Sequence, residues 1–263
     1  MIGYESDRSN IANYFYRQKD TNLNFPAHIH DSFEFIYCYA GETRLSVDGK
    51  EAVLRGGEAT LLFPSVVHSY ATDTFSETVL FVFSSSYIHS FYESYKYKTP
   101  LSPVFPFASC EDAVRTLADP ATDHYRIRSC LYLILSEFIK HTEFADCDVH
   151  ARDLATKILA YVKENFTQEI SLRELAKQLG YSYNYVSGSF KSIFHTNFLQ
   201  LVNGYRIGLA QHLLENTSDT VIGISAACGY DSPQSFNRNF LSITGMTPTA
   251  YRAKQAAKRS GGL

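Results

Sequence analysis

Hydrophobic residues in the first third of the chain fall in short segments typical of β-strands. Between residues 22 and 82 these segments are rich in aromatic and β-branched residues and read FEFIYCYA, TRLSV, EAVLR, ATLLF and ETVLFVF. Residue pairs that favour turns separate them, at Ala40-Gly41, Asp48-Gly49, Gly56-Gly57 and Pro64-Ser65. Strands of this length and spacing predict a small barrel or sandwich.

Further along the chain, the spacing of apolar residues becomes that of helices. Residues 85–107 contain three prolines and predict an irregular connector. An apolar stripe from Leu131 to Ile139 either packs on the strands or forms the seam of a dimer. The sequence Ser171-x-x-Glu174 predicts a capping box at a helix start. The predicted helices cover residues 112–142, 153–165, 172–179, 183–193, 198–214, 221–228, 233–243 and 249–257.

Composition indicates a globular protein. Of the 263 residues, 45% are hydrophobic and 19% are charged, and this length is enough for two domains. No segment approaches the roughly 20 apolar residues of a membrane-spanning helix, and residues 1–10 are too polar for a secretory signal. We therefore expect a cytoplasmic protein with no membrane partner. Scattered cysteines without a CxxC pair predict buried thiols instead of disulfides or a zinc site: Cys38, Cys110, Cys130, Cys147 and Cys228.

Charge is distributed unequally between the two parts of the chain. Residues 1–152 hold 13 Lys and Arg against 20 Asp and Glu, whereas residues 153–263 hold 11 against 7. The net charges are therefore −7 and +4. The second part is the one suited to a polyanion such as nucleic acid.

The helical part contains an internal repeat. The segment ISLRELAKQLGYS (170–182) aligns with DTVIGISAACGYD (219–231), so that Gly180 matches Gly229, and Phe190 matches Phe240 with an offset of 50 residues. Each copy predicts a short helix, a tight turn at Gly-Tyr and a second helix. This is a helix-turn-helix, whose second helix lies in the DNA major groove.

Residues 171–252 resemble the DNA-binding domain of the AraC/XylS family of transcription regulators. The resemblance rests on LAKQLGYSYNYVSGSFK, on YRIGLAQHLL and on ISAACGYDSPQSFNRNFLSITGMTPTAYR. It implies an all-α domain with two helix-turn-helix motifs that binds double-stranded promoter or operator DNA. An all-helical interaction module that does not bind DNA is the alternative.

Exposed polar residues of each second helix are the candidates for contacting bases. Asn and Gln pair with adenine, and Arg with guanine, through two hydrogen bonds, whereas Lys191 lies nearer to the phosphates. Arg206 matches a position that the family keeps basic, which implies either a phosphate contact or an internal ion pair. The repeated apolar positions predict core residues, namely Val186, Phe190, Phe236 and Phe240. The predicted DNA-binding residues are Tyr183, Asn184, Ser187, Gly188, Lys191, Arg206, Gln234, Ser235, Asn237 and Arg238.

The chain departs from the family pattern at three positions. Family members usually carry Arg or another long side chain where Gly188 stands, and basic residues where Leu241 and Ser242 stand. Fewer contacts to bases and phosphates predict weak, salt-sensitive binding by a monomer. A homodimer would offset this weakness through two linked half-sites.

Histidines in the strand region follow a second pattern. His28-x-His30 is followed by Glu34 and Gly41, and a second segment runs from Gly57 through Pro64 to His68. Residues 24–70 thereby resemble the two cupin motifs, in the form found in sensor domains of AraC-type regulators. Because His28, His30 and Glu34 have the same parity along a strand, they share one face, which we expect to be the interior of the barrel.

Three histidines and one glutamate are also a workable ligand set for divalent iron, manganese, nickel or zinc. Metal cupins include dioxygenases and isomerases, but the second motif here is one residue shorter than the usual enzyme form and lacks its glycine. AraC-type sensors commonly hold an organic effector without metal, and a buried hydrogen-bonded cluster requires no ligand. The resemblance therefore implies no catalytic residue and no cofactor, and it assigns His28, His30, Glu34 and His68 to effector binding.

Together these patterns predict an α+β protein in three parts. A cupin-like β-barrel covers residues 1–107, a helical dimerisation and linker segment covers 108–152, and the DNA-binding domain covers 153–263. The predicted function is effector-controlled transcription regulation without enzyme activity. Aromatic walls around polar groups would suit a sugar or a related metabolite. Two alternatives remain, a metal-dependent cupin enzyme fused to a DNA-binding domain and a constitutive DNA-binding protein whose barrel only dimerises.

Overall fold

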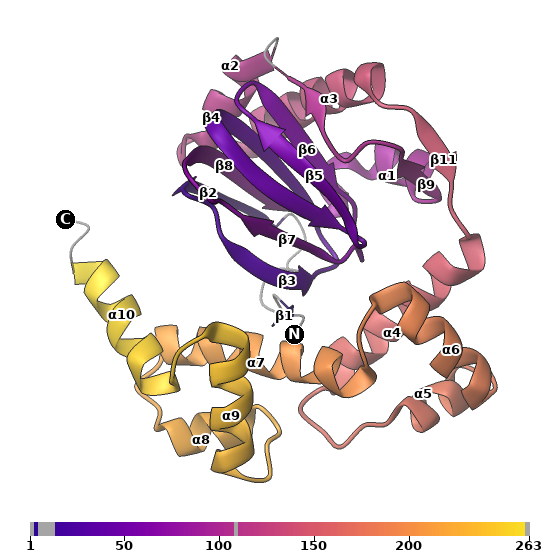
Figure 1. Cartoon of the computed structure of the whole chain (residues 1–263), viewed down its shortest axis with the longest axis vertical. Helices are drawn as coiled ribbons and strands as arrows, with labels where there is room; N and C mark the ends of the chain where they lie inside the picture. Colours follow the sequence, from indigo (N-terminus) through magenta and orange to yellow (C-terminus); the bar gives the residue numbers. More distant parts are fainter. Residues whose placement is uncertain (1–2, 5–13, 108–109, 261–263) are drawn as a thin grey trace. The chain divides into compact units, whose positions relative to one another are not determined.

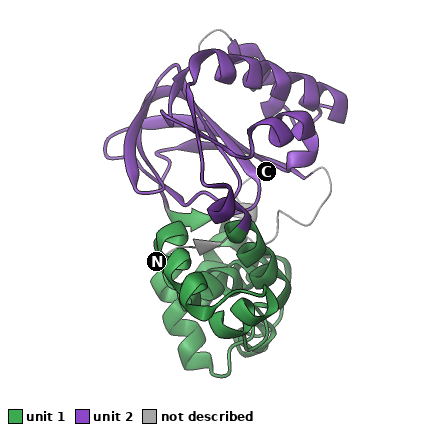
Figure 2. Cartoon of the chain, turned by 90° about the vertical axis from the view of Figure 1, so that its right-hand side faces the viewer, with its two compact units in different colours: residues 1–7, 26–29, 154–263 green, residues 8–25, 30–153 purple. Residues whose placement is uncertain are grey.

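The computed structural model describes residues 3–4, 14–107 and 110–260, which belong to two compact units (Figures 1 and 2). One unit, called the sheet unit, comprises residues 8–25 and 30–153; the other, the helical unit, comprises residues 1–7, 26–29 and 154–263. Residues 26–29 lie on a strand of the sheet and are described with it. None of the helices in the described ranges is long and apolar enough to cross a membrane.

The sheet unit is built around one long strand, β4 (Phe33–Val47). The first half of β4 lies between β6 and β8, and its second half lies between β5 and β7. The shared strand thus joins two sets of strands, which confirms the predicted β-rich N-terminal domain. The other strands are β1 (Gly3–Tyr4), β2 (Phe15–Thr21), β3 (Phe25–Ile29), β5 (Lys50–Arg55), β6 (Glu58–Leu62), β7 (His68–Ala71), β8 (Ser76–Phe83) and β10 (Phe105–Pro106).

Strand β4 replaces two strands and a turn in the prediction. The pair Ala40-Gly41 was expected to end a strand, but the chain continues through a β-bulge between Cys38 and Ala40. Gly41 has φ +75°, and a Cβ atom there would lie 2.1 Å from the Phe75 carbonyl oxygen. The glycine therefore permits a close approach inside the sheet. The turn predicted at Asp48-Gly49 is present, with φ values of 47° and 78°.

Consecutive side chains of β4 enter two different cores. Phe33, Phe35 and Tyr37 pack with phenylalanines of β8 and with helices, whereas Ile36 and Cys38 point to the interior between the two sets of strands. The interior core consists of Leu23, Ile36, Cys38, Leu45, Leu54, Leu62, Tyr70, Leu80 and Val82.

Residues 85–142 differ from the prediction in two places. The expected connector at 85–107 contains a 3₁₀ turn (Ser85–Ile88), helix α1 (His89–Tyr95) and strand β9 (Lys98–Pro100), which pairs with β11 (Phe144–Asp146). The expected helix at 112–142 is two helices, α2 (Glu111–Ala118) and α3 (His124–His141). The break follows from Pro120, because a proline drives the residue before it out of the helical region; Asp119 has ψ 120°.

The apolar stripe of α3 packs on the sheet. Leu131, Ile134, Leu135 and Phe138 are buried in the same core as Phe33 and Phe81, whereas Ile139 is 40% exposed. The stripe is therefore not available as a dimer seam, and that interpretation is wrong. Together with α2, the helix belongs to the sheet unit and not to a separate linker segment.

The predicted helices of the helical unit are all present, with α4 beginning earlier than expected. They are α4 (Val149–Asn165), α5 (Leu172–Gln178), α6 (Tyr183–Phe194), α7 (Phe198–Asn216), α8 (Val221–Ala227), α9 (Pro233–Thr244) and α10 (Pro248–Ser260). The Ser171–Glu174 capping box is also present. The four predicted core residues Val186, Phe190, Phe236 and Phe240 are buried.

The cysteines are all free. Cys38, Cys130 and Cys228 are buried as predicted, but Cys110 and Cys147 are half-exposed, because they lie just outside α2 and α4, where packing is incomplete. Burial raises the pKa of the Cys38 thiol to about 11 and that of Cys228 to about 12. Both thiols are therefore protonated and unreactive at neutral pH.

Alanine substitutions at two glycines of the sheet unit should differ in cost. Gly41 and Gly49 both have positive φ, so each substitution adds strain of about 1 kcal/mol. Only at Gly41 does the new Cβ meet backbone, while no atom lies within 4 Å at Gly49. Urea unfolding should show a loss of about 1 kcal/mol for Gly49→Ala and of roughly 3 kcal/mol for Gly41→Ala. Equal losses would mean that the bulge opens freely to admit a methyl group.

Candidate functional site

Both repeats fold as a helix-turn-helix, with α5 and α6 in the first copy and α8 and α9 in the second. The turns contain Gly180 with φ 73° and Gly229 with φ 80°, a conformation that favours glycine. At Gly229 the added Cβ would also lie 2.4 Å from the Thr167 carbonyl oxygen. The two glycines of the repeat are therefore explained by the backbone that each turn requires.

The second helix of each copy starts in the same way. The Ser182 hydroxyl accepts a hydrogen bond from the Tyr185 N–H, and the Ser232 hydroxyl accepts one from the Ser235 N–H. Phe190 of α6 and Phe240 of α9, 50 residues apart, are both buried, so the same face of each second helix is directed to the core. The remaining faces are thus directed to solvent, as a helix that enters a groove requires.

The predicted base-reading residues lie mainly on these faces. Tyr183, Asn184, Gly188 and Lys191 of α6 are exposed, as are Gln234, Asn237 and Arg238 of α9, whereas Ser187 and Ser235 are half-buried.

Helices α6 and α9 have one basic residue each, and the two residues do not lie at equivalent positions when the copies are aligned with an offset of 50. Gly188 corresponds to Arg238, and Lys191 corresponds to Leu241. The two copies therefore present different chemistry on one scaffold.

Arg206 has an internal role. Its guanidinium donates hydrogen bonds to the carbonyl oxygens of Phe166, at 2.7 Å, and Gln168, at 2.9 Å. It also lies over the ring of Tyr230, 5.3 Å from the centroid. The partners are backbone carbonyls and a ring, so the predicted ion pair is replaced by charge-assisted hydrogen bonds that connect α7 to the segment after α4.

A second arginine of this kind is not among the residues predicted from sequence. Arg252 of α10 donates to the carbonyl oxygens of Leu214, at 3.2 Å, and Asp219, at 2.7 Å. Both arginines follow a tyrosine, in Tyr205-Arg206 and Tyr251-Arg252. This repeated Tyr-Arg pair is the signal that would have identified the role in advance.

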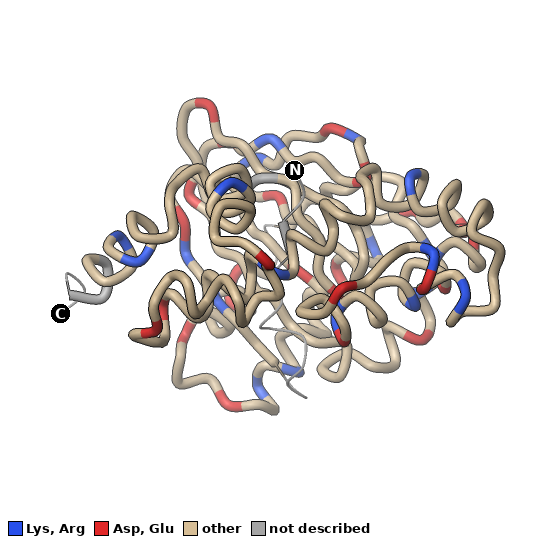
Figure 3. The backbone as a smooth tube through the Cα atoms, turned by 90° about the horizontal axis from the view of Figure 1, so that it is seen from below, with Lys and Arg blue, Asp and Glu red and all other residues tan. Residues whose placement is uncertain are grey.

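Another basic residue missed from sequence lies beside α6. The guanidinium of Arg173, on α5, lies 4.8 Å from the ring centroid of Tyr183. After Asp231 the charged residues are all basic, whereas Lys and Arg are mixed with Asp and Glu along the rest of the chain (Figure 3). The positive charge of the helical part is therefore concentrated after Asp231, in the second copy of the repeat and the segment that follows it.

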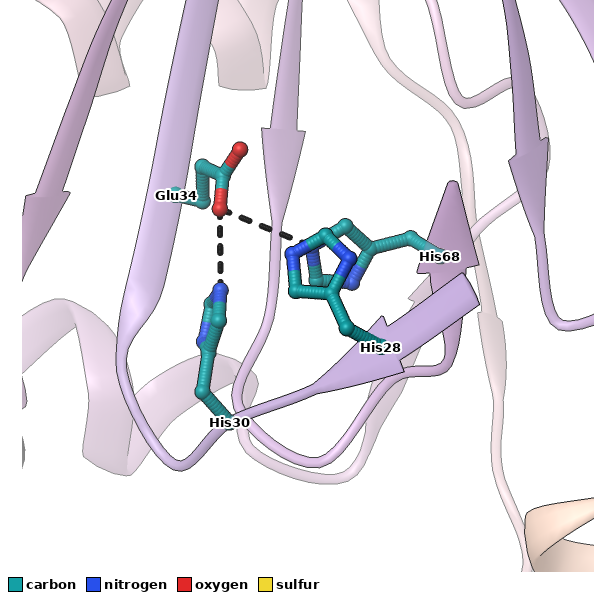
Figure 4. A group of neighbouring side chains, drawn as sticks. All are labelled: His28, His30, Glu34 and His68. Atoms are coloured by element: carbon teal, nitrogen blue, oxygen red, sulfur yellow. Dashed lines mark hydrogen bonds and ion pairs between the residues drawn. The ribbon is translucent and has the colours of Figure 1, made fainter. Parts of the chain in front are cut away.

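The predicted effector residues of the sheet unit converge in space (Figure 4). His28, His30, Glu34 and His68 are 3%, 3%, 2% and 1% exposed. One ligand-capable atom from each lies within 4.8 Å of the other three. They come from β3, from the loop after it, from β4 and from β7. We call these four residues the interior cluster.

Hydrogen bonds orient the interior cluster. The carboxylate of Glu34 lies 2.9 Å from His30 Nε2 and 3.5 Å from His68 Nε2. The Tyr70 hydroxyl donates to its other oxygen at 2.8 Å. Burial raises the pKa of Glu34, but hydrogen bonds and charge from His30 and His68 outweigh burial and hold the pKa well below its usual value. Glu34 is therefore ionised at neutral pH.

The walls around the interior cluster are mostly aliphatic, because the phenylalanines of β4 and β8 face the helices instead. Tyr70 is the tyrosine that joins the cluster directly, with its ring 5.6 Å from that of His68. The aromatic walls expected from the sequence are therefore largely on the other face of the sheet.

Models of known protein families match both the strand-rich part and the helical part of the chain. Residues 10–124 match the model of the AraC-like ligand binding domain, and residues 175–254 match that of a helix-turn-helix domain. These matches give the chain an AraC-like ligand-binding domain and a helix-turn-helix domain. The chain belongs to the AraC family.

Individual relatives are similar over part of their length. The melibiose operon regulatory protein of Escherichia coli K12 is 26% identical over 110 residues, which are 42% of this chain and 36% of that protein. The uncharacterized regulator YtdP of Bacillus subtilis is 31% identical over 111 residues, which are 42% of this chain and 14% of that protein. The chain thus matches less than half the length of either relative.

A solved structure shows the same fold over nearly the whole chain. ToxT from Vibrio cholerae, with a bound unsaturated fatty acid, has a TM-score of 0.66 and 15% sequence identity. The similarity covers 93% of this chain and 96% of that chain.

Removing Arg206 should destabilise the helical unit, because it leaves two backbone carbonyls without their charged donor. We expect Arg206→Ala to lower the free energy of unfolding by roughly 2 kcal/mol. Arg238→Ala is the matched control, since this exposed arginine should change stability by less than about 0.5 kcal/mol. Urea titration of both variants decides the matter, and similar curves for the two would refute the internal role.

Proposed function

We propose that this protein binds specific operator sequences and that a small molecule held in the sheet unit controls this binding. The observation that carries the proposal is the presence of two helix-turn-helix copies with polar outer faces on the same chain as a buried polar cluster. An AraC-type regulator of this kind acts through its ligands and its DNA, and the enzyme alternative gains no support from the comparisons.

The exposed residues of α6 and α9 divide into two roles in this proposal. Asn184, Gln234 and Asn237 have side-chain amides that can pair with adenine, and Arg238 has the fork that pairs with guanine. Lys191 near the end of α6 contacts phosphate and adds affinity without sequence preference. Tyr183, Ser187 and Ser235 complete the surface, and Gly188 leaves space beside α6 for the DNA to approach.

Two linked copies of the chain would strengthen DNA binding. With one basic residue on each outer helix face, a single chain has few charged contacts to offer. The face of α3 directed away from the sheet carries Tyr125, Tyr132 and Leu133, which are 81%, 43% and 54% exposed. We propose this face, in place of the buried stripe, as the contact between two copies in a homodimer.

The effector in this proposal is a small polar molecule, and a carbohydrate is the first class to test. Hydroxyl groups suit the histidines, the carboxylate and Tyr70 of the interior. One relative is by name the regulator of the melibiose operon. Few aromatic rings belong to the interior core, namely Tyr70 and the partly buried Tyr14 and Tyr16, which favours a small metabolite over a long oligosaccharide.

Operator binding should separate the roles of Arg238 and Lys191. Arg238→Ala should weaken binding to the best operator by roughly 1–3 kcal/mol and relax selectivity at one base pair. Lys191→Ala should weaken binding about equally on all sequences, because phosphates carry no sequence information. Gel-shift titration on single-base operator variants measures the affinity of both proteins. An unchanged base preference of the Arg238→Ala protein would show that Arg238 does not contact a base.

The effector response should depend on the interior cluster. Replacing both His30 and His68 by Ala should abolish the response, because an effector shifts the protein only through its unequal affinity for two states. Operator binding without effector should persist, since neither residue lies on α6 or α9. A reporter assay with and without inducer tests this, alongside circular dichroism to verify folding. A folded double variant with a normal response would place the effector elsewhere.

A further inference from the structure

A groove of about 1240 Å³ lies between the two copies of the repeat in the helical unit. One side of it carries outer-face residues of α6 and the residue that follows this helix, namely Tyr183, Ser187, Lys191 and His195. The other side includes the turn of the second copy, residues 229–231, which lies just before α9. Duplex DNA that contacts both α6 and α9 therefore passes over this groove.

His195 ends α6 in a backbone conformation that glycine adopts more readily. Its φ is 50°, and its N–H donates to the Lys191 carbonyl oxygen at 3.0 Å. At the offset of 50, Gly245 ends α9 with φ 74° and donates to the Leu241 carbonyl oxygen at 2.9 Å. The two helices thus end in the same backbone structure, and the imidazole ring is what the first copy adds.

This ring has a cost for the fold and no partner that explains it. An L-residue other than glycine is strained at positive φ, and residues held in such conformations are concentrated at functional sites. His195 is exposed, and its ring makes no hydrogen bond, ion pair or ring contact within the ranges that the structure describes. Contacts inside the chain therefore do not account for a histidine here.

The groups beside His195 in the groove are hydrogen-bond donors. The Lys191 ammonium is exposed and forms no ion pair with a residue that the structure describes. The Thr196 hydroxyl donates to Gln200 Oε1 at 2.6 Å, which leaves the amide nitrogen of Gln200 as a donor. An imidazole carries at least one N–H whether it is neutral or protonated. All of these residues line the groove, and a phosphate oxygen accepts hydrogen bonds from each kind of group.

The acids of the groove belong to its other side. Glu169 and Asp231 line the groove, and neither forms an ion pair within the described part of the chain. Their segments contact each other, because a Cβ atom at Gly229 would lie 2.4 Å from the Thr167 carbonyl oxygen. Repulsion from these carboxylates directs a phosphate away from the turn of the second copy and toward the end of α6.

We propose that His195, together with Lys191 and Gln200, binds a phosphate of the DNA backbone between the segments that α6 and α9 contact. The N-terminal residues of a second helix meet the base edges, so a side chain that follows its last residue meets the backbone. The contact adds affinity on every sequence and fixes the position of α6 along the duplex. The inference rests on the proposed function in that DNA is the ligand, and it adds a residue outside both second helices.

Substitutions of His195 in the full-length protein test the proposal. His195→Gly gives the first copy the residue of the second and removes only the donor. Its dissociation constant for a fluorescein-labelled duplex of random sequence, measured by anisotropy at low salt, should rise about tenfold. His195→Asn keeps a donor, and asparagine tolerates positive φ, so it should bind within about threefold of the natural chain. His150→Ala removes an exposed histidine of α4 and should bind as the natural chain does.

Stability separates a phosphate contact from a structural role of His195. Glycine relieves the strain at positive φ, so the urea midpoint of His195→Gly should stay close to that of the natural chain. A phosphate contact therefore predicts weaker binding at an unchanged midpoint, whereas a structural role predicts that both fall together.

Uncharged phosphates then locate the contact. In an operator selected from random DNA, each phosphate is replaced in turn by a methylphosphonate, which carries no charge. One replacement should weaken binding by the natural chain and have little effect on His195→Gly, because the two changes remove the same contact. Losses that add at every phosphate would contradict the contact.

Three results would overturn the proposal. They are equal affinity of His195→Gly and the natural chain for the random duplex, a loss confined to one base pair of the operator, and a His195→Asn protein that binds no better than His195→Gly. Failure to select any operator would refute the proposed sequence-specific function. The affinities for random duplex would still decide whether His195 contacts the backbone.

Discussion

The architecture of the sheet unit depends on the burial of both faces of β4. Every residue of the segment 33–38 is buried, and alternation sends Phe33, Phe35 and Tyr37 to the helices while Glu34, Ile36 and Cys38 go to the interior. A shift of one residue would exchange the two sets and place Glu34 among phenylalanines. The aromatic packing that fixes the register therefore also fixes the position of the one carboxylate in the interior cluster.

The helical unit uses a different constraint, which is repetition of backbone contacts. In each copy a glycine of positive φ makes the turn, a serine caps the outer helix, and an arginine from the following helix donates to carbonyls before the copy begins. These residues form hydrogen bonds with backbone groups or set the backbone conformation. The outer face of each second helix takes no part in holding the fold together. The outer faces of α6 and α9 are thus free to differ, and they do at Gly188 and Arg238.

The sequence predicted the structure well wherever the conformation of a residue depends on its neighbours along the chain. The Ser171–Glu174 capping box, the glycine turns and the repeated phenylalanines were identified from spacing alone. The prediction failed where distant partners decide, as at Gly41, which was expected in a turn but lies inside β4, close to the carbonyl oxygen of Phe75. The α3 stripe was correctly recognised as apolar, but only the fold shows that β4 and β8 cover it. Pro120 was a local signal for the break between α2 and α3 that the apolar periodicity outweighed in the prediction.

The interior cluster shows which features of a site a sequence motif predicts and which require the structure. His28, His30 and Glu34 converge as expected, but not through parity along one strand, because they come from β3, from the loop after it and from β4; His68 joins them from β7. Sequence carries no information on the hydrogen bonds of the histidine rings, whose partners are the carbonyls of Ser32 and Val66 and the carboxylate of Glu34. Because the phenylalanines of β4 and β8 face the helices, the described interior combines aliphatic side chains with the polar groups of the cluster and of Tyr70.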